Sequence, residues 1–223
     1  MRYRYASSMT GKVRIIGGRW RGRRLEVPDL AGLRPSGDRG RETLFNWLQD
    51  RVPGARCLDL FAGTGALGLE AISRGAASAT LVERDRTLCA ALRTIARDWP
   101  GGDRLEIVQA DARHWLKTAS GPFDLVFLDP PFDAGLYGAS LEALLQPGVL
   151  APAARIYIES NARSPSPIAV QASVECASAP CLEANFEAKT HWLPLREKRL
   201  GDVRMQLLEA APDDTGPARG ASV

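Results

Sequence analysis

The tetrapeptide Asp129-Pro130-Pro131-Phe132 directly follows the apolar run 123–128. That run predicts a buried parallel strand, and loops after such strands usually carry the ligand chemistry of open α/β sheets. Proline fixes φ and lacks an N–H group, so the proline carbonyls can face outward as hydrogen-bond acceptors. Asp129 and the carbonyl of Pro130 are therefore suited to hold the two hydrogens of a planar exocyclic amine, while Phe132 stacks on its ring.

The chemistry that this arrangement favours is attack by the amine nitrogen. A planar exocyclic amine is a poor nucleophile because its lone pair is delocalised into the ring. Acceptors aimed at its hydrogens favour the state in which the nitrogen attacks. A turn that only ends a strand is the alternative interpretation of Asp-Pro, and the tetrapeptide alone does not separate the two.

A second group of residues, from Asp59 to Gly68, places three glycines between a predicted strand and a predicted helix. Gly63, Gly65 and Gly68 allow a tight turn and a close approach of a ligand to the main chain. The spacing also fits a dinucleotide loop, with Glu83 twenty residues after Gly63, where a ribose-binding carboxylate is expected. Asp59 would repel a pyrophosphate and attract an ammonium group. The loop therefore favours S-adenosylmethionine, which carries an ammonium and a sulfonium but no phosphate.

A further carboxylate, Asp111, comes just after the predicted strand 105–109. It can accept a hydrogen bond from the amine of an adenine. It can equally cap the helix predicted from residue 112, and the two roles are compatible.

Basic residues are concentrated near the N-terminus. Residues 1–56 contain 13 Lys or Arg and 5 Asp or Glu, a net charge of +8, whereas residues 57–223 contain 16 and 21, a net charge of −5. Arginine binds phosphate in a bidentate manner and stacks on bases, and tryptophan adds a stacking surface, so this segment is expected to bind nucleic acid. A solvated basic face is the alternative. The predicted contact residues are Arg14, Arg19, Trp20, Arg21, Arg23, Arg24 and Arg34.

Strands and helices are predicted to alternate from residue 56 onward. Strands are expected at 57–60, 79–83, 105–109, 123–128 and 155–159, and helices at 66–74, 86–99, 112–119 and around 141–145. This alternation predicts a parallel sheet with helices on both faces. Strands at 189–195 and 203–208, joined through 199–202, predict an antiparallel hairpin that closes the sheet edge.

The N-terminal part precedes this α/β pattern with a short β-hairpin, 13–16 and 25–27, and a helix at 39–49. Residues 161–188 are rich in Ala, Ser and Pro and have no assigned element, and residues 211–223 are expected to be a disordered tail.

The composition limits the other classes of protein. The chain has 223 residues, 45% of them hydrophobic, which suits one substantial core with a small appendage. It has no apolar stretch of about 18 residues or more and no secretory signal pattern. Its four cysteines lack paired spacing and it has only two histidines, so neither disulfides nor a metal site is expected. A cytoplasmic protein without membrane contact is expected.

These motifs, in this order, resemble the RsmD family of bacterial 16S rRNA guanine-N2 methyltransferases. The resemblance rests on 13–22 (VRIIGGRWRG), 34–48 (RPSGDRGRETLFNWL), the glycine loop, the tetrapeptide 129–132 and 196–203 (REKRLGDV), and it extends over most of 13–209. Two positions depart from the family pattern: Ser36 stands where threonine is usual, and Gly40 replaces a branched residue. Both affect only the segment that resembles the lid over the methionine end of the cofactor.

The resemblance implies a Rossmann-like class I S-adenosylmethionine-dependent methyltransferase fold, with a mainly parallel seven-stranded sheet and an antiparallel C-terminal hairpin. It implies methylation of the exocyclic N2 of one guanine, position 966 in the reference numbering of 16S rRNA, in the 30S subunit or its assembly intermediate. The expected division is a basic RNA-binding arm at 1–38, a methyltransferase domain at 39–210 and the tail at 211–223, in a monomer.

The implied residues fall into two groups. The catalytic residues are Asp129, Pro130, Pro131 and Phe132, and the cofactor-binding residues are Asp59, Phe61, Gly63, Gly65, Glu83, Asp111 and Ser36. Gly63 and Gly65 are expected against the methionine portion of the cofactor, Glu83 on the ribose hydroxyls and Asp111 near adenine.

Four alternatives stay open from the residues themselves. A DNA adenine-N6 methyltransferase uses a nearly identical tetrapeptide, although no target-recognition domain is evident here. A protein-glutamine methyltransferase usually has Asn in place of Asp129 and does not explain the basic arm. A nicotinamide-dependent oxidoreductase and a non-catalytic RNA-binding module are the other two.

Overall fold

The computed structural model describes residues 9–28, 37–131, 135–168 and 192–210. A small N-terminal hairpin consists of β1 (Met9–Arg14) and β2 (Arg24–Pro28). The other strands are β3 (Arg56–Asp59), β4 (Ser78–Glu83), β5 (Leu105–Gln109), β6 (Phe123–Leu128), β7 (Leu150–Asn161), β8 (Trp192–Leu200) and β9 (Val203–Ala210). The helices are α1 (Asp38–Trp47), α2 (Ala66–Ser73), α3 (Arg86–Asp98), α4 (Ala112–Leu116) and α5 (Tyr137–Leu144), with a 3-10 turn η1 at Gly102–Arg104.

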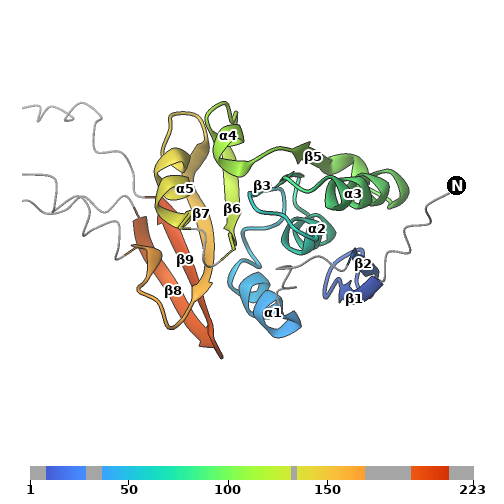
Figure 1. Ribbon diagram of the computed structural model, residues 1–223, viewed down its shortest axis with the longest axis horizontal. Helices are drawn as coiled ribbons and strands as arrows, with labels where there is room; N and C mark the ends of the chain where they lie inside the picture. The colour runs from blue at the N-terminus through green and yellow to red at the C-terminus, as the bar shows by residue number, and fades with distance from the viewer. Residues whose placement is uncertain (1–8, 29–36, 132–134, 169–191, 211–223) are drawn as a thin grey trace, which may run out of the picture.

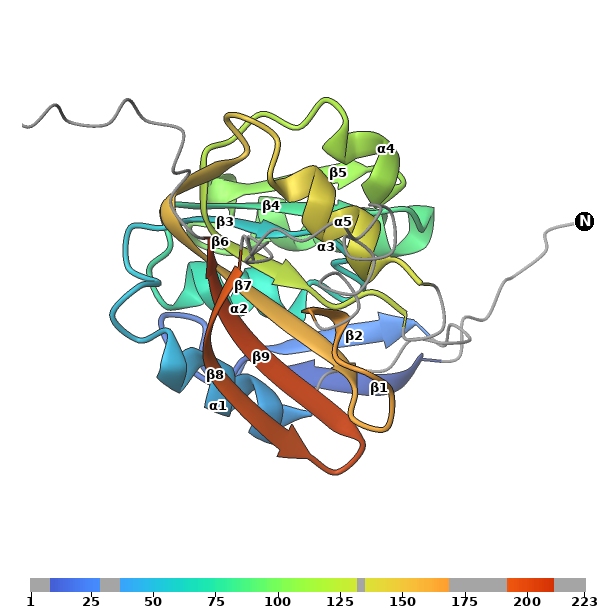
Figure 2. The same ribbon diagram turned by 90° about the vertical axis from the view of Figure 1, so that its left-hand side faces the viewer.

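Seven strands form one sheet in the order β5-β4-β3-β6-β7-β9-β8 (Figures 1 and 2). The five strands from β5 to β7 in this order are mutually parallel, whereas β9 is antiparallel to both β7 and β8. The predicted parallel sheet with a closing antiparallel hairpin is therefore confirmed.

Helices cover both faces of the sheet (Figure 2). One hydrophobic cluster joins residues of α1, α2 and α3 to one face, and a second joins α4 and α5 to the other. The side chains of β3 and β6 alternate between the two clusters, as expected for strands buried on both faces. Among the described residues, no helix is long and apolar enough to cross a membrane.

Several predicted strand boundaries are wrong. Strand β7 runs from Leu150 to Asn161, whereas 155–159 was expected. Strand β8 continues to Leu200 through residues predicted as a turn, because 196–200 pair with β9; only Gly201, at φ 60°, and Asp202 remain between the strands. Strand β1 ends at Arg14, whereas a strand was predicted at 13–16. Positions 189–191 of the predicted hairpin, most of 161–188 and the expected tail lie outside the described residues.

The N-terminal hairpin packs on the α/β domain and shares its core. Val13, Ile15, Trp20 and Leu25 belong to the same hydrophobic cluster as α1 and α2. The described part of the predicted arm is therefore bound to the domain by a continuous core, rather than linked to it only through the chain.

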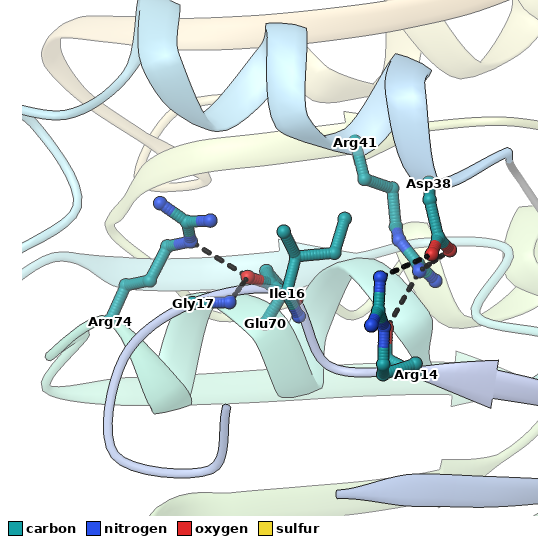
Figure 3. A network of polar contacts seen from close by, with 7 residues as sticks. All are labelled: Arg14, Ile16, Gly17, Asp38, Arg41, Glu70 and Arg74. Atoms are coloured by element: carbon teal, nitrogen blue, oxygen red, sulfur yellow. Dashed lines mark hydrogen bonds and ion pairs between the residues drawn. The ribbon is translucent and has the colours of Figure 1, made fainter. Parts of the chain in front are cut away.

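A buried carboxylate fixes the chain after β1 (Figure 3). Glu70 of α2 is fully buried, and its two oxygens accept the N–H groups of Ile16 at 2.8 Å and Gly17 at 2.7 Å. The guanidinium of Arg74 pairs with the same carboxylate at 2.8 Å. Because the N–H of Ile16 donates to Glu70, that residue leaves the ladder of the hairpin, which explains the early end of β1.

A second contact ties α1 to the hairpin (Figure 3). The guanidinium of Arg41 is 1% exposed and donates to the carbonyl of Arg14 at 2.8 Å and to Asp38 at 2.7 Å. Burial lowers the pKa of Arg41, and the charges of Asp38 and Glu70 oppose that shift. The start of α1 is thereby held against the hairpin on the face that also carries α2.

The main chain of the hairpin packs against the end of α2 at Gly18, which makes a direct test of docking possible. A Cβ on Gly18 would lie 1.9 Å from the carbonyl oxygen of Ser73, whereas one on Gly22 would meet nothing within 4 Å. Both residues have positive φ, 74° and 84°. We expect Gly22→Ala to lower the free energy of unfolding by about 1 kcal/mol through backbone strain alone. Gly18→Ala should cost about 1–3 kcal/mol more because of the collision.

Urea denaturation of both variants measures this difference. Equal losses for Gly18→Ala and Gly22→Ala would contradict the docked position of the hairpin.

Candidate active site

Each of the five parallel strands carries an acidic residue at or just beyond its carboxyl end. In sheet order these residues are Asp111 after β5, Glu83 in β4, Asp59 in β3, Asp129 after β6 and Glu159 in β7. Because the strands are parallel, their carboxyl ends lie along one edge of the sheet. The four acidic residues predicted from the sequence therefore meet at this edge, together with Glu159, which was not predicted as a site residue.

The glycine loop between β3 and α2 has the backbone that its sequence predicts. Gly63 and Gly65 have φ of 53° and 76°, a region that residues with side chains rarely adopt. A Cβ on Gly65 would lie 2.4 Å from a methyl carbon of Leu92. The N–H of Gly63 donates to Glu83 at 2.8 Å, and the other oxygen of Glu83 accepts the N–H of Asp85 at 2.7 Å. Glu83 thus shapes the loop, and its role on a ribose stays a prediction.

Asp59 is enclosed by the protein. Its side chain is 2% exposed and accepts the N–H of Gly68 at 2.9 Å, which fixes the first turn of α2. Burial raises the pKa of Asp59 to about 7; the hydrogen bond from Gly68 opposes this shift and the charge of Glu83 adds to it. Asp59 thus shapes the glycine loop, and its contact with the ammonium group of a ligand stays a prediction. Phe61, also predicted at this site, is half-buried against the second hydrophobic cluster.

Asp111 caps α4, as one of its two interpretations predicted. Its carboxylate accepts the N–H groups of Arg113 at 3.0 Å and His114 at 3.3 Å. The guanidinium of Arg113 pairs with it, and this contact lowers the pKa of Asp111. A contact with adenine remains a prediction.

The tetrapeptide begins directly after β6, next to β3 in the sheet. Asp129 is half-buried, Pro130 is buried and Pro131 is exposed. Phe132 lies outside the described residues, as do Ser36 and Arg34. The structure thus places Asp129 beside the strand that leads into the glycine loop.

Sequence reasoning missed a group of residues beside Asp129. The hydroxyl of Tyr137 donates to the backbone carbonyl of Glu159 at 2.7 Å, and that of Tyr157 donates to its carboxylate at 2.8 Å. Burial raises the pKa of Glu159, and the bond from Tyr157 opposes this. Burial first, and then the charges of Asp129 and Glu159, raise the pKa of both tyrosines. The signal was an acidic residue ending the predicted strand 155–159, much as Asp129 follows 123–128.

Trp20 does not offer the predicted stacking surface. Its side chain is 1% exposed, its ring N–H donates to the carbonyl of Pro100 at 3.0 Å, and its ring packs edge-on against Trp99 at 5.1 Å. Its backbone N–H also donates to the hydroxyl of Ser73. Trp20 is therefore a core residue, and the prediction for this residue is wrong.

The predicted arginines of the hairpin are on the surface, at one end of it. Exposed side chains are those of Arg14, Arg19, Arg21, Arg23 and Arg24. The N–H of Arg19 donates to the carbonyl of Ser73, at the end of α2 away from the glycine loop. An eight-residue helix is about 12 Å long. The turn that carries Arg19, Arg21 and Arg23, called the basic turn below, therefore lies well away from the edge of the sheet with the five acidic residues, called the carboxylate edge.

Comparison with solved structures defines the class. The fold matches the Escherichia coli protein yhhF with a TM-score of 0.70 and 42% identity, over 90% of this chain and 98% of that one. It also matches SMU.776, a proposed methyltransferase solved in complex with SAH, with a TM-score of 0.60 over 84% of this chain and 53% of that one. At 17% identity the second match shows the fold alone. The fold is that of S-adenosylmethionine-dependent methyltransferases.

Sequence comparison gives the family. Residues 13–178 match the model described as Conserved hypothetical protein 95. Ribosomal RNA small subunit methyltransferase D of Escherichia coli K12 is 49% identical over 91% of this chain and 92% of its own length. That of Haemophilus influenzae is 42% identical over 70% and 82%. The chain belongs to this family of methyltransferases, the RsmD family, which confirms the resemblance seen in the sequence and leaves no support for a nicotinamide-dependent oxidoreductase.

The buried carboxylate of Asp59 predicts a pH-dependent stability. Between about pH 4 and 7 the folded protein holds a proton on Asp59 that the unfolded chain has lost, so this group's contribution to stability falls as pH rises. Relative to the wild type, Asp59→Asn should gain about 2 kcal/mol of unfolding free energy between pH 5 and 8, measured by urea denaturation without cofactor.

Asp124→Asn is the matched control. The hydrogen bond from Arg56 lowers the pKa of Asp124, so Asp124 is ionised in both the folded and the unfolded state over this pH range. The difference in unfolding free energy between Asp124→Asn and the wild type should therefore not change with pH. A flat difference for Asp59→Asn as well would show that Asp59 does not hold a proton in the fold.

Proposed function

We propose that this chain transfers a methyl group from S-adenosylmethionine to the exocyclic N2 of a specific guanine in the rRNA of the small ribosomal subunit. The observation that carries the proposal is the position of Asp129 and Pro130 at the end of β6, next to the end of β3 where the glycine loop begins. The RsmD relatives are named as methyltransferases of small-subunit ribosomal RNA, which supports the choice of substrate.

The glycine loop and its neighbours fit S-adenosylmethionine. The positive φ of Gly63 and Gly65 removes side chains where a ligand would approach the backbone, and Glu83 is a half-buried carboxylate suited to ribose hydroxyls. Asp111 would lie near the adenine, and Phe61 and Ser36 complete the proposed set. When bound, the cofactor supplies an electrophilic methyl group on a sulfonium centre.

The residues after β6 act on the nucleophile. A guanine rotated out of its stack presents the two hydrogens of N2 to the carboxylate of Asp129 and the carbonyl of Pro130. These acceptors orient the amine so that its lone pair is available for attack. As the new N–C bond forms, the nitrogen must lose a proton, and the half-buried carboxylate of Asp129 is placed to receive it. In this proposal, Pro131 rigidifies the loop and Phe132 stacks on the base.

The exposed arginines extend the proposed contact with RNA beyond the active site. Phosphate contacts at the basic turn and base contacts at the carboxylate edge would together span at least the length of α2, about 12 Å, which favours a folded RNA over a single nucleotide. We therefore propose that the substrate is the 30S subunit or its assembly intermediate, bound by a monomer of this protein, with Arg34 adding to the arginines of the hairpin.

The proposed role of Asp129 predicts a large loss of activity on its removal. Asp129→Ala should lower methyl transfer to small ribosomal subunits by at least about 100-fold, because a charged acceptor for the amine is lost. The melting temperature and the binding of S-adenosylmethionine should change little. Transfer of tritium from labelled cofactor measures methyl transfer, and calorimetry measures the melting temperature and the binding of the cofactor.

Asp124→Ala is the control for losing a carboxylate from the same strand. Asp124 lies in β6 and pairs with Arg56, beside the amino end of β3. Methyl transfer should survive its removal. If Asp129→Ala kept wild-type methyl transfer, Asp129 would not be the acceptor for the amine, and the role proposed for this loop would be wrong.

A further inference from the structure

The residues after β6 hold an exocyclic amine but do not distinguish one base from another. Asp129 and the carbonyl of Pro130 are acceptors for two amine hydrogens, and adenine N6, cytosine N4 and guanine N2 all offer such hydrogens. What differs is the ring atom beside the amine. Adenine and cytosine have a nitrogen with a lone pair on one side of the amine and a carbon on the other, whereas guanine has the N1–H donor on one side and the lone pair of N3 on the other. A second acceptor next to the first would therefore select guanine.

The neighbouring strand supplies such an acceptor. In the ladder between β6 and β7, Phe127 is opposite Tyr157 and Leu128 is opposite Ile158. The next residue on each strand is Asp129 and Glu159, and adjacent strands lie about 4.8 Å apart. Tyr157 belongs to the cluster on the face that carries α1 and α2, so Glu159, two residues later, points to that face too.

The carboxylate of Asp129 acts electrostatically on the same group of residues. Its negative charge acts on the hydroxyls of both Tyr137 and Tyr157, and these two hydroxyls donate to the carbonyl and the carboxylate of Glu159. Asp129 and Glu159 are thus neighbours around one pair of tyrosines, at the carboxylate edge of the sheet.

Glu159 is held rigidly and keeps capacity to accept. Tyr137 of α5 fixes its backbone and Tyr157 fixes its side chain, which is 9% exposed. On β9 it faces Met205, an apolar neighbour. A carboxylate offers about four acceptor sites, and the hydroxyl of Tyr157 takes one of them. A buried carboxylate is costly unless it is hydrogen-bonded, so an N–H donor from a bound base would satisfy it further.

We propose that Glu159, oriented by Tyr157, accepts the N1–H of the target guanine while Asp129 and Pro130 hold its N2, so that Glu159 determines specificity for guanine. This inference rests on the proposed function and adds the residue that recognises the base. Tyr157 is a positioning residue, because it acts on the base only through Glu159.

A pair of substrates tests the contact. Small subunits are reconstituted with either guanine or 2-aminopurine at the methylated position; 2-aminopurine keeps the amine on C2, has a lone pair on N1 instead of a hydrogen, and lacks the oxygen on C6. The Glu159 variants below therefore attribute the preference to the contact at N1. We expect wild-type protein to methylate guanine with a kcat/KM about 100-fold higher than 2-aminopurine, since a carboxylate facing that lone pair has no donor to accept.

The variant Glu159→Gln reverses part of this chemistry. Glutamine keeps the size of the side chain and an oxygen for Tyr157, and it adds an N–H₂ donor that can pair with the lone pair of 2-aminopurine. The preference for guanine should fall by at least about tenfold, through both a lower kcat/KM for guanine and a higher one for 2-aminopurine. Tyr157→Phe, which leaves the carboxylate but frees it, should lower the preference severalfold.

The outcomes separate this inference from the proposed function. If wild-type protein methylates guanine and the preference is unchanged in both variants, Glu159 does not read the base and the inference is overturned while the function stands. If the variants lose activity equally on both substrates and still bind the cofactor, the inference is also overturned, since Glu159 then serves the chemical step. If Glu159→Gln fails to fold, Tyr157→Phe alone decides. If wild-type protein methylates neither substrate, the proposed function itself fails.

Discussion

The parallel alignment of five strands is the constraint on which the site depends. Parallel strands place all of their carboxyl ends at one edge, so five residues that are far apart in the sequence form one row of carboxylates. The row divides into two parts. Asp111, Glu83 and Asp59 accept backbone N–H groups and shape the loops proposed to hold the cofactor, whereas Asp129 and Glu159 lie on the strands proposed to hold the base.

Buried carboxylates that accept backbone N–H groups also hold the larger pieces together. Glu70 takes two N–H groups from the chain after β1 and joins the hairpin to α2. Asp59 takes one from Gly68 and ties the opposite end of the same helix to β3. Helix α2 therefore links the basic turn of the hairpin to the glycine loop, and the two surfaces proposed to touch the RNA and the cofactor are held at a fixed spacing.

The sequence predicted most of what depends on local pattern. The alternation of strands and helices, the turn at Gly63 and Gly65 and the strand before Asp129 follow from the spacing of apolar residues and glycines along short segments. The contacts that buried groups make across the fold do not follow from such local patterns. Trp20 follows arginines and glycines that resemble an exposed arm, and its contact with Pro100, eighty residues away, appears only in the fold. The proposed role of Glu159 likewise depends on its position beside Asp129 on the neighbouring strand, which only the fold reveals.

The most direct test of the account is to map the methylated base. Wild-type protein and labelled S-adenosylmethionine are incubated with small ribosomal subunits and with naked 16S rRNA, both from a strain that lacks the corresponding gene, and the modified nucleotide is identified. The account predicts label on N2 of a single guanine, with the subunit preferred over naked RNA. Label on adenine, on DNA or on protein alone would contradict it.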